Sequence, residues 1–126
     1  MKWIIAIVVL AAVYYWANFQ FLKLDDLRAN VHSALIDLSA AGNAVNEEFA
    51  RNKAMPKSRD FPVTQKHVRG VKLESDGRLV ATLSFPDSPE ADGKHLVFEP
   101  QVTGTDLQWR CRSPDLDHKF LPVQCR

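Results

Sequence analysis

The chain has 126 residues, of which 46% are hydrophobic and 25% are charged, and its formal net charge is +1. This length excludes a protein of several domains and leaves room for one globular domain at most. The globular part is smaller still, because the chain starts with a long apolar run. The two cysteines of the chain, Cys111 and Cys125, both lie within its last eighteen residues.

Residues 3–22 read WIIAIVVLAAVYYWANFQFL and contain no charged side chain. A helix of this length rises roughly 30 Å, the thickness of one hydrocarbon core. Residues 1–23 are therefore predicted to form a transmembrane helix, with Tyr14, Tyr15 and Trp16 as an aromatic cluster at a membrane interface. A cleaved secretory signal and a buried helix of a soluble domain are the alternatives. The signal is disfavoured because no small-x-small cleavage site follows the run.

From residue 24 to residue 52 the apolar residues recur every three or four positions, which predicts an amphipathic helix. No proline occurs before Pro56, so this helix and the apolar one before it are expected to be continuous over about 50 residues. The apolar stripe consists of Leu24, Leu27, Val31, Ala34, Leu35, Leu38, Ala41, Val45 and Phe49. The other faces carry Asp25, Arg28, Asn30, His32, Asp37, Asn43 and Glu47.

After a predicted linker at residues 51–62, the pattern changes to short alternating runs separated by turn residues. These runs predict four antiparallel strands, and Gly77 is expected in a left-handed turn position between the first two. One face of this sheet is apolar and needs a cover, which the amphipathic helix supplies. The fold class is therefore α+β, with a long amino-terminal helix packed on a four-stranded antiparallel sheet. The four runs are HVRGVKL, RLVATLS, HLVFEPQV and DLQWRCR, which correspond to residues 67–73, 78–84, 95–102 and 106–112.

The two cysteines are predicted to form a disulfide, because so small a sheet domain often needs a covalent link. A bond between Cys111 and Cys125 closes a loop of about 15 residues and is worth on the order of 3 kcal/mol. A pair of free buried thiols and a zinc site that includes His118 are the alternatives, and the second has poor ligand spacing. Since disulfides persist in the periplasm or outside the cell, the domain after the apolar helix is expected to face away from the cytoplasm.

The end of the chain has the form W-x-C, then a short loop, then K-F-L-P-x-x-C-R, and residues 27–126 as a whole resemble the type IV pilins. The resemblance implies a pilin-like head at residues 53–126 with a disulfide loop at 111–125. It also implies either a structural filament subunit, homo-oligomeric when assembled, or a membrane-held component of the pilus system. The partners in both cases are other pilin subunits, the pilus assembly machinery and the inner membrane. The protein is then a single-pass inner-membrane protein with a periplasmic head, or part of an extracellular pilus. The matching residues are Trp109, Cys111, Lys119, Phe120, Leu121, Pro122, Cys125 and Arg126.

Residues 1–6 read MKWIIA and lack the Gly-Phe junction and the early glutamate that type IV pilins usually carry; the first acidic residue is Asp25. Helices in apolar surroundings associate by close packing. Such packing specifies axial register weakly, because sliding one apolar helix along another leaves similar contacts. The residues expected to make the helix contacts of assembly are Ile4, Ile5, Ile7, Val8, Ala11 and Ala12.

The sequence contains no recognisable catalytic set, metal-ligand spacing or phosphate loop, so we expect no enzyme, no metal and no cofactor. Residues 53–72 carry six basic residues and one acidic residue, Asp60. This basic stripe suggests an alternative function, a membrane-tethered pilin-fold module that binds nucleic acid, for example to capture DNA, without polymerising. A solvated sheet edge, which also discourages pairing with other sheets, is the favoured explanation of the stripe. The candidate DNA-binding residues are Lys53, Lys57, Arg59, Lys66, Arg69 and Lys72.

Overall fold

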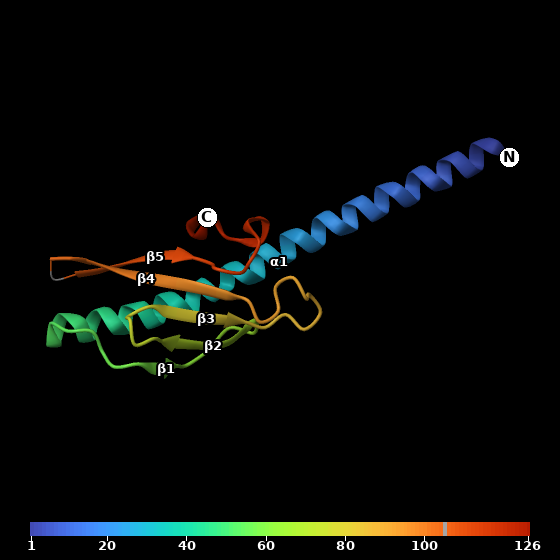
Figure 1. Ribbon diagram of the computed structural model, residues 1–126. Helices are drawn as coiled ribbons and strands as arrows, with labels where there is room; N and C mark the ends of the chain where they lie inside the picture. The colour runs from blue at the N-terminus through green and yellow to red at the C-terminus, as the bar shows by residue number, and fades with distance from the viewer. Residues whose placement is uncertain (105) are drawn as a thin grey trace.

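The computed structural model describes residues 1–104 and 106–126, apart from the side chains of residues 20–25. One helix, α1 (Lys2–Asn52), runs the length of the molecule, and its carboxyl-terminal half lies against an antiparallel sheet (Figure 1). The helix is continuous, as its lack of proline predicts. It ends where Lys53 takes a left-handed conformation with φ 55° and donates its backbone N–H to the carbonyl of Phe49 at 2.7 Å, a common helix stop.

The sheet has five strands in the order β1-β2-β3-β4-β5, and all neighbours are antiparallel. The prediction of four strands was therefore wrong by one. The additional strand, β1, lies inside the predicted linker at residues 51–62 and has only three residues between Pro56 and Pro62, too few to show an alternating pattern. The strands are β1 (Arg59–Phe61), β2 (Val68–Leu73), β3 (Leu79–Leu83), β4 (His95–Thr103) and β5 (Asp106–Arg112).

Gly77 connects β2 to β3 with a φ of 91°, which confirms its predicted left-handed turn position. Its backbone N–H donates to the carbonyl of Glu74 at 3.0 Å. The turn between β4 and β5 contains Gly104 at φ 65°. Its neighbour Thr105, part of the predicted turn, lies outside the described residues.

The core lies between the apolar stripe of α1 and one face of the sheet, as predicted. Leu38 of the helix and Leu79 and Leu83 of β3 are completely buried there. Phe49, Phe98 and Trp109 are partly buried and pack against this core. The buried members of the helix stripe are Leu27, Val31, Ala34, Leu35, Leu38, Ala41 and Val45; the side chain of Leu24 is not among those described.

Asp37 was predicted on a polar face of the helix, but only 3% of its surface is exposed. The segment between β1 and β2 crosses α1 at this point. The Asp37 carboxylate accepts hydrogen bonds from the backbone N–H of Thr64 at 3.1 Å and of Gln65 at 3.0 Å, and from the Thr64 hydroxyl at 2.5 Å. Asp37 is buried because it satisfies the polar groups of a chain segment that helical periodicity does not reveal.

Candidate functional site

The amino-terminal part of α1 projects away from the head (Figure 1), and the side chains of residues 2–19 are all exposed. Within the described residues, one helical segment, Lys2–Phe19, is long and apolar enough to cross a membrane, with a mean hydropathy of 1.6. The predicted assembly residues therefore lie on a helix that the head does not cover. Their exposed fractions are 67% for Ile4, 65% for Ile5, 63% for Ile7 and 60% for Val8, and Ala11 and Ala12 are exposed as well.

Cys111 and Cys125 form a disulfide that joins the end of β5 to the last turn of the chain, a 3-10 helix at Val123–Cys125. The loop that it closes is also anchored by packing, because Phe120 and Leu121 are buried in the core. Arg28 of α1 donates from Nε to the backbone carbonyl of Lys119 at 2.5 Å. The disulfide loop is thereby held against the helix at the level where α1 enters the head.

Asp115 of the same loop forms hydrogen bonds with His95 at the start of β4. Its carboxylate accepts from the backbone N–H of His95 at 2.9 Å and lies 2.7 Å from the His95 Nδ1, while the Ser113 hydroxyl donates to the His95 carbonyl at 2.6 Å. Partial burial works against ionisation of Asp115, but the hydrogen bonds and charge of His95 outweigh it and lower the pKa of this carboxyl. The ionised carboxylate therefore stabilises the loop.

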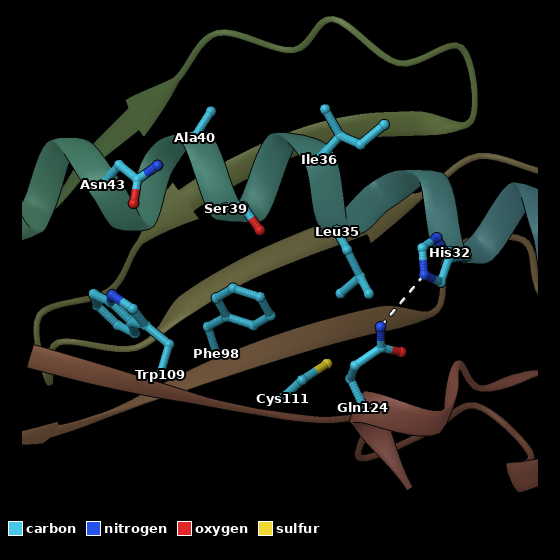
Figure 2. Close-up of a pocket in the computed structure, with 10 residues that line it drawn as sticks. All are labelled: His32, Leu35, Ile36, Ser39, Ala40, Asn43, Phe98, Trp109, Cys111 and Gln124. Carbon is cyan, nitrogen blue, oxygen red and sulfur yellow. Dashed lines mark hydrogen bonds between the residues drawn. The ribbon is translucent and has the colours of Figure 1, made fainter.

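An apolar groove of about 720 Å³ lies between α1 and the edge of the sheet at β5 (Figure 2). Figure 2 shows Leu35 and Ser39 of the helix pointing toward Phe98, Trp109 and Cys111 of the strands. Ile36 points outward from the helix, and Gln124 lies near His32 at one end. Ile36 is 55% exposed although it lies beside the buried stripe. The three-four spacing of apolar residues in α1 did not predict this groove. The sequence feature that could have indicated it is Ile36, an apolar residue outside the predicted stripe. Its full lining is His32, Leu35, Ile36, Ser39, Ala40, Asn43, Phe98, Trp109, Cys111 and Gln124.

One wall of the groove is fixed by Trp109. Its indole Nε1 donates to the Asn46 Oδ1 at 3.0 Å. The same ring lies so close to Gly42 that a Cβ at position 42 would come within 3.1 Å of Nε1. A glycine in the middle of the helix, which costs about 1 kcal/mol in propensity, thus allows the strand to approach α1 closely.

The basic stripe at residues 53–72 is distributed over different parts of the head. Arg59 forms an ion pair with Glu48 of α1 at 2.5 Å, and Arg69 pairs with Asp92 at 3.2 Å. Lys72 lies directly opposite Asp60 in the pairing of β1 with β2. Lys53 and Lys57 lie beyond the end of α1, and Lys66 lies in the loop before β2. Arg59 and Arg69 are thus each paired with a carboxylate.

The histidines do not come together. His67 stacks on Phe85 with a ring centroid distance of 4.6 Å, His95 contacts Asp115, and His32 lies near Gln124. Within the described part of the chain, no group of three histidine, cysteine or acidic residues is arranged to hold a metal ion.

The arrangement is thus a head with a disulfide loop on a helix whose first half is apolar and uncovered. A family model described as pilin, a bacterial filament protein, matches residues 27–126. Because this match covers most of the chain, the protein belongs to the type IV pilin family. A comparison with curated proteins finds no match to this chain.

Proposed function

We propose that this protein is a subunit of a type IV pilus-like filament that is held in the inner membrane before assembly. The observation that carries the proposal is the exposed apolar segment Lys2–Phe19, which continues into the head without a break in the helix. Apolar surface of this extent is unfavourable in water. A bilayer can cover it before assembly, and the helices of neighbouring subunits can cover it in a filament.

The disulfide supports a location of the head outside the cytoplasm. Disulfides persist in the periplasm and on the cell surface but are rare in the reducing cytoplasm. With the Cys111–Cys125 bond in the head and one apolar helix before it, the proposed topology is a single pass with the head in the periplasm. The pilus assembly machinery would then extract the subunit into the filament.

Shearing of filaments from cells that produce the chain tests this proposal. We expect the wild-type chain in the sheared fibres and, before assembly, in the membrane fraction. Val8→Lys places a charge in the apolar segment, which costs about 3 kcal/mol near the centre of a bilayer, and should deplete the chain from both fractions.

Val123→Lys is the matched control, because Val123 is an equally apolar residue on the head, 77% exposed. This variant should remain in the membrane fraction and should still assemble into fibres. The proposal would fail if the wild-type chain were absent from sheared fibres, or if Val8→Lys assembled as well as Val123→Lys.

A further inference from the structure

Strand β5 has an outer edge that is not paired with any other segment of the head. It is the last strand in the sheet order, and β4 is its neighbour on the other side. Within the described part of the chain, no backbone hydrogen bond joins β5 to a segment other than β4. An unpaired strand edge presents a row of N–H and C=O groups that can pair with another chain.

The two edges of the sheet differ in their ability to accept a further strand. The opposite edge strand, β1, has only three residues and lies between Pro56 and Pro62. A short strand flanked by prolines is a poor template for pairing. Strand β5 has seven residues and no proline. The sheet is therefore closed to extension at β1 and open to it at β5.

The last part of the β5 edge is occupied by the end of the chain. The disulfide holds Cys125 beside Cys111, with their Cα atoms 4.6 Å apart. The free edge therefore consists of residues 106–110, which correspond to roughly 17 Å of strand at 3.4 Å per residue.

The groove in Figure 2 lies along this free edge, on the face of the sheet that α1 covers. Figure 2 shows Ser39 of the helix pointing toward Trp109 of β5 across the groove. Ser39 and Asn43 are exposed, and Phe98 and Trp109 supply apolar walls. Alternate side chains of a strand point to the same face of a sheet. A strand added to β5 would thus direct every second side chain toward the groove.

The other side chains of an added strand would lie on the outer face, beside Gln108 and Arg110, both of which are exposed. Glu99 is opposite Arg110 in the pairing of β4 with β5. Its carboxylate is paired with Arg112 at 2.5 Å, and Arg110 forms no ion pair with the residues that the structure describes. A carboxylate next to Arg110 on a neighbouring strand would form a favourable cross-strand pair.

We propose that β5 is a docking site for an extended segment of another protein, which adds to the sheet as a sixth strand. Its apolar side chains enter the groove, and an acidic side chain between them pairs with Arg110. In strand addition, main-chain hydrogen bonds provide affinity, and pockets for alternate side chains provide specificity. This inference goes beyond the proposed function and does not depend on it.

The occupant is a different protein rather than a second copy of β5. Two copies could pair antiparallel about Gln108, with Asp106 of each facing Arg110 of the other. This pairing is two-fold symmetric and reverses the strand direction. Because β5 runs alongside α1 (Figure 1), it would also reverse α1. The two apolar segments Lys2–Phe19 would then point in opposite directions and could not enter the same membrane.

A segment tethered to the full chain tests the site without knowledge of the natural partner. The probe is a strand of alternating valine and glutamate, attached after Arg126 through a flexible glycine-serine linker of about ten residues, which spans roughly 17 Å on average. The end of the chain lies near β5 (Figure 1), so the tether gives the probe a millimolar effective concentration. Amide hydrogen exchange in detergent measures the protection of the β5 edge.

We expect the probe to slow exchange about tenfold at alternate residues of 106–110, because the outward N–H groups gain acceptors. The matched control replaces each valine of the probe with proline, which has no N–H to donate to β5, and should give no protection. The two outcomes that would overturn the inference are an unprotected edge with the valine probe and equal protection with the proline probe.

Charge exchange tests the preference for an acidic segment. Arg110→Glu should reduce protection by the valine-glutamate probe about threefold, and a probe with lysine in place of glutamate should restore it. Lys72→Glu makes the same change of charge on β2, away from the β5 edge, and should leave protection unchanged. Equal protection in Arg110→Glu and Lys72→Glu would refute the charge preference.

The chain without a probe distinguishes a second copy from another protein. Its β5 edge should exchange rapidly at every protein concentration. Protection that increases with concentration would show that a second copy covers the edge and would overturn the inference. Thermal unfolding of each variant confirms that the head is folded. The proposed function is tested separately by shearing, so it can fail or survive independently of these results.

Discussion

At the scale of single residues, several polar side chains in this head form hydrogen bonds between segments that are distant in sequence. Asp37 joins α1 to the segment before β2, Asp115 joins the disulfide loop to β4, and Asn46 joins α1 to Trp109 of β5. In the described part of the chain, no buried side-chain nitrogen or oxygen lacks a hydrogen-bond partner. Loss of one of these side chains therefore leaves its partner without a bond.

Replacing Asp37 with alanine is expected to lower the free energy of unfolding by about 1–3 kcal/mol, because the N–H groups of Thr64 and Gln65 lose their acceptor. Urea denaturation measures the change. Asp60→Ala, on the exposed face of β1, serves as the control and should change stability by about 0.5 kcal/mol or less. Equal stability of the two variants would contradict the role assigned to Asp37.

The Asp115 carboxylate makes the stability of the disulfide loop sensitive to acid. Because the pKa of Asp115 is lowered in the folded protein, its contribution is present above the ordinary aspartate value of about 4 and is lost as the pH falls through the folded value. Thermal unfolding between about pH 6 and pH 2 should show a shallower acid decline for Asp115→Asn than for wild type. Identical pH profiles would show that the contact with His95 does not stabilise the ionised form.

At the scale of secondary-structure elements, α1 has two different sides within the head. Leu38 is completely buried, while Ile36, two residues earlier, is 55% exposed in the groove. Leu38→Ala should cost about 2–5 kcal/mol of stability through lost burial and a residual cavity. Ile36→Ala should cost about 0.5 kcal/mol or less. Denaturant titration of both variants measures the difference, and a comparable loss at the two positions would refute this assignment of faces.

The disulfide loop is the second element whose contribution to thermal stability can be measured separately. Its closure by Cys111 and Cys125 is worth about 3 kcal/mol in the chain-entropy model, so reduction should lower the thermal midpoint markedly. Burial of Phe120 and Leu121 should keep the loop docked after reduction. Alkylation of both thiols without prior reduction would contradict the bond.

At the scale of the whole molecule, the head is complete without the first part of α1. The side chains of residues 2–19 are exposed, and the buried core of α1 begins at Leu27. A chain that lacks residues 2–19 should therefore unfold within a few degrees of the full chain in detergent, and it should lose membrane retention. A large loss of stability would mean that this segment folds back on the head.

The sequence predicted most of this architecture because its elements are recorded in local patterns. Alternation from Leu79 to Leu83 and the three-four spacing from Leu27 to Val45 each reflect one buried face. Strand β1 was missed because three residues between prolines carry no pattern. Asp37 was misplaced because periodicity treats a carboxylate as a solvent-facing group, whereas its partners, Thr64 and Gln65, lie far along the chain.

The sequence by itself determined the uncovered apolar helix, the sheet with its helical cover, the disulfide and the pilin ending, since each depends on residue types at fixed spacings. Only the tertiary structure decided which surfaces meet or stay open. The groove beside Ile36 and the dispersal of the basic stripe arise where segments distant in sequence are brought together or held apart. The physical reason is that burial and charge at a surface depend on three-dimensional neighbours, which a linear pattern does not specify.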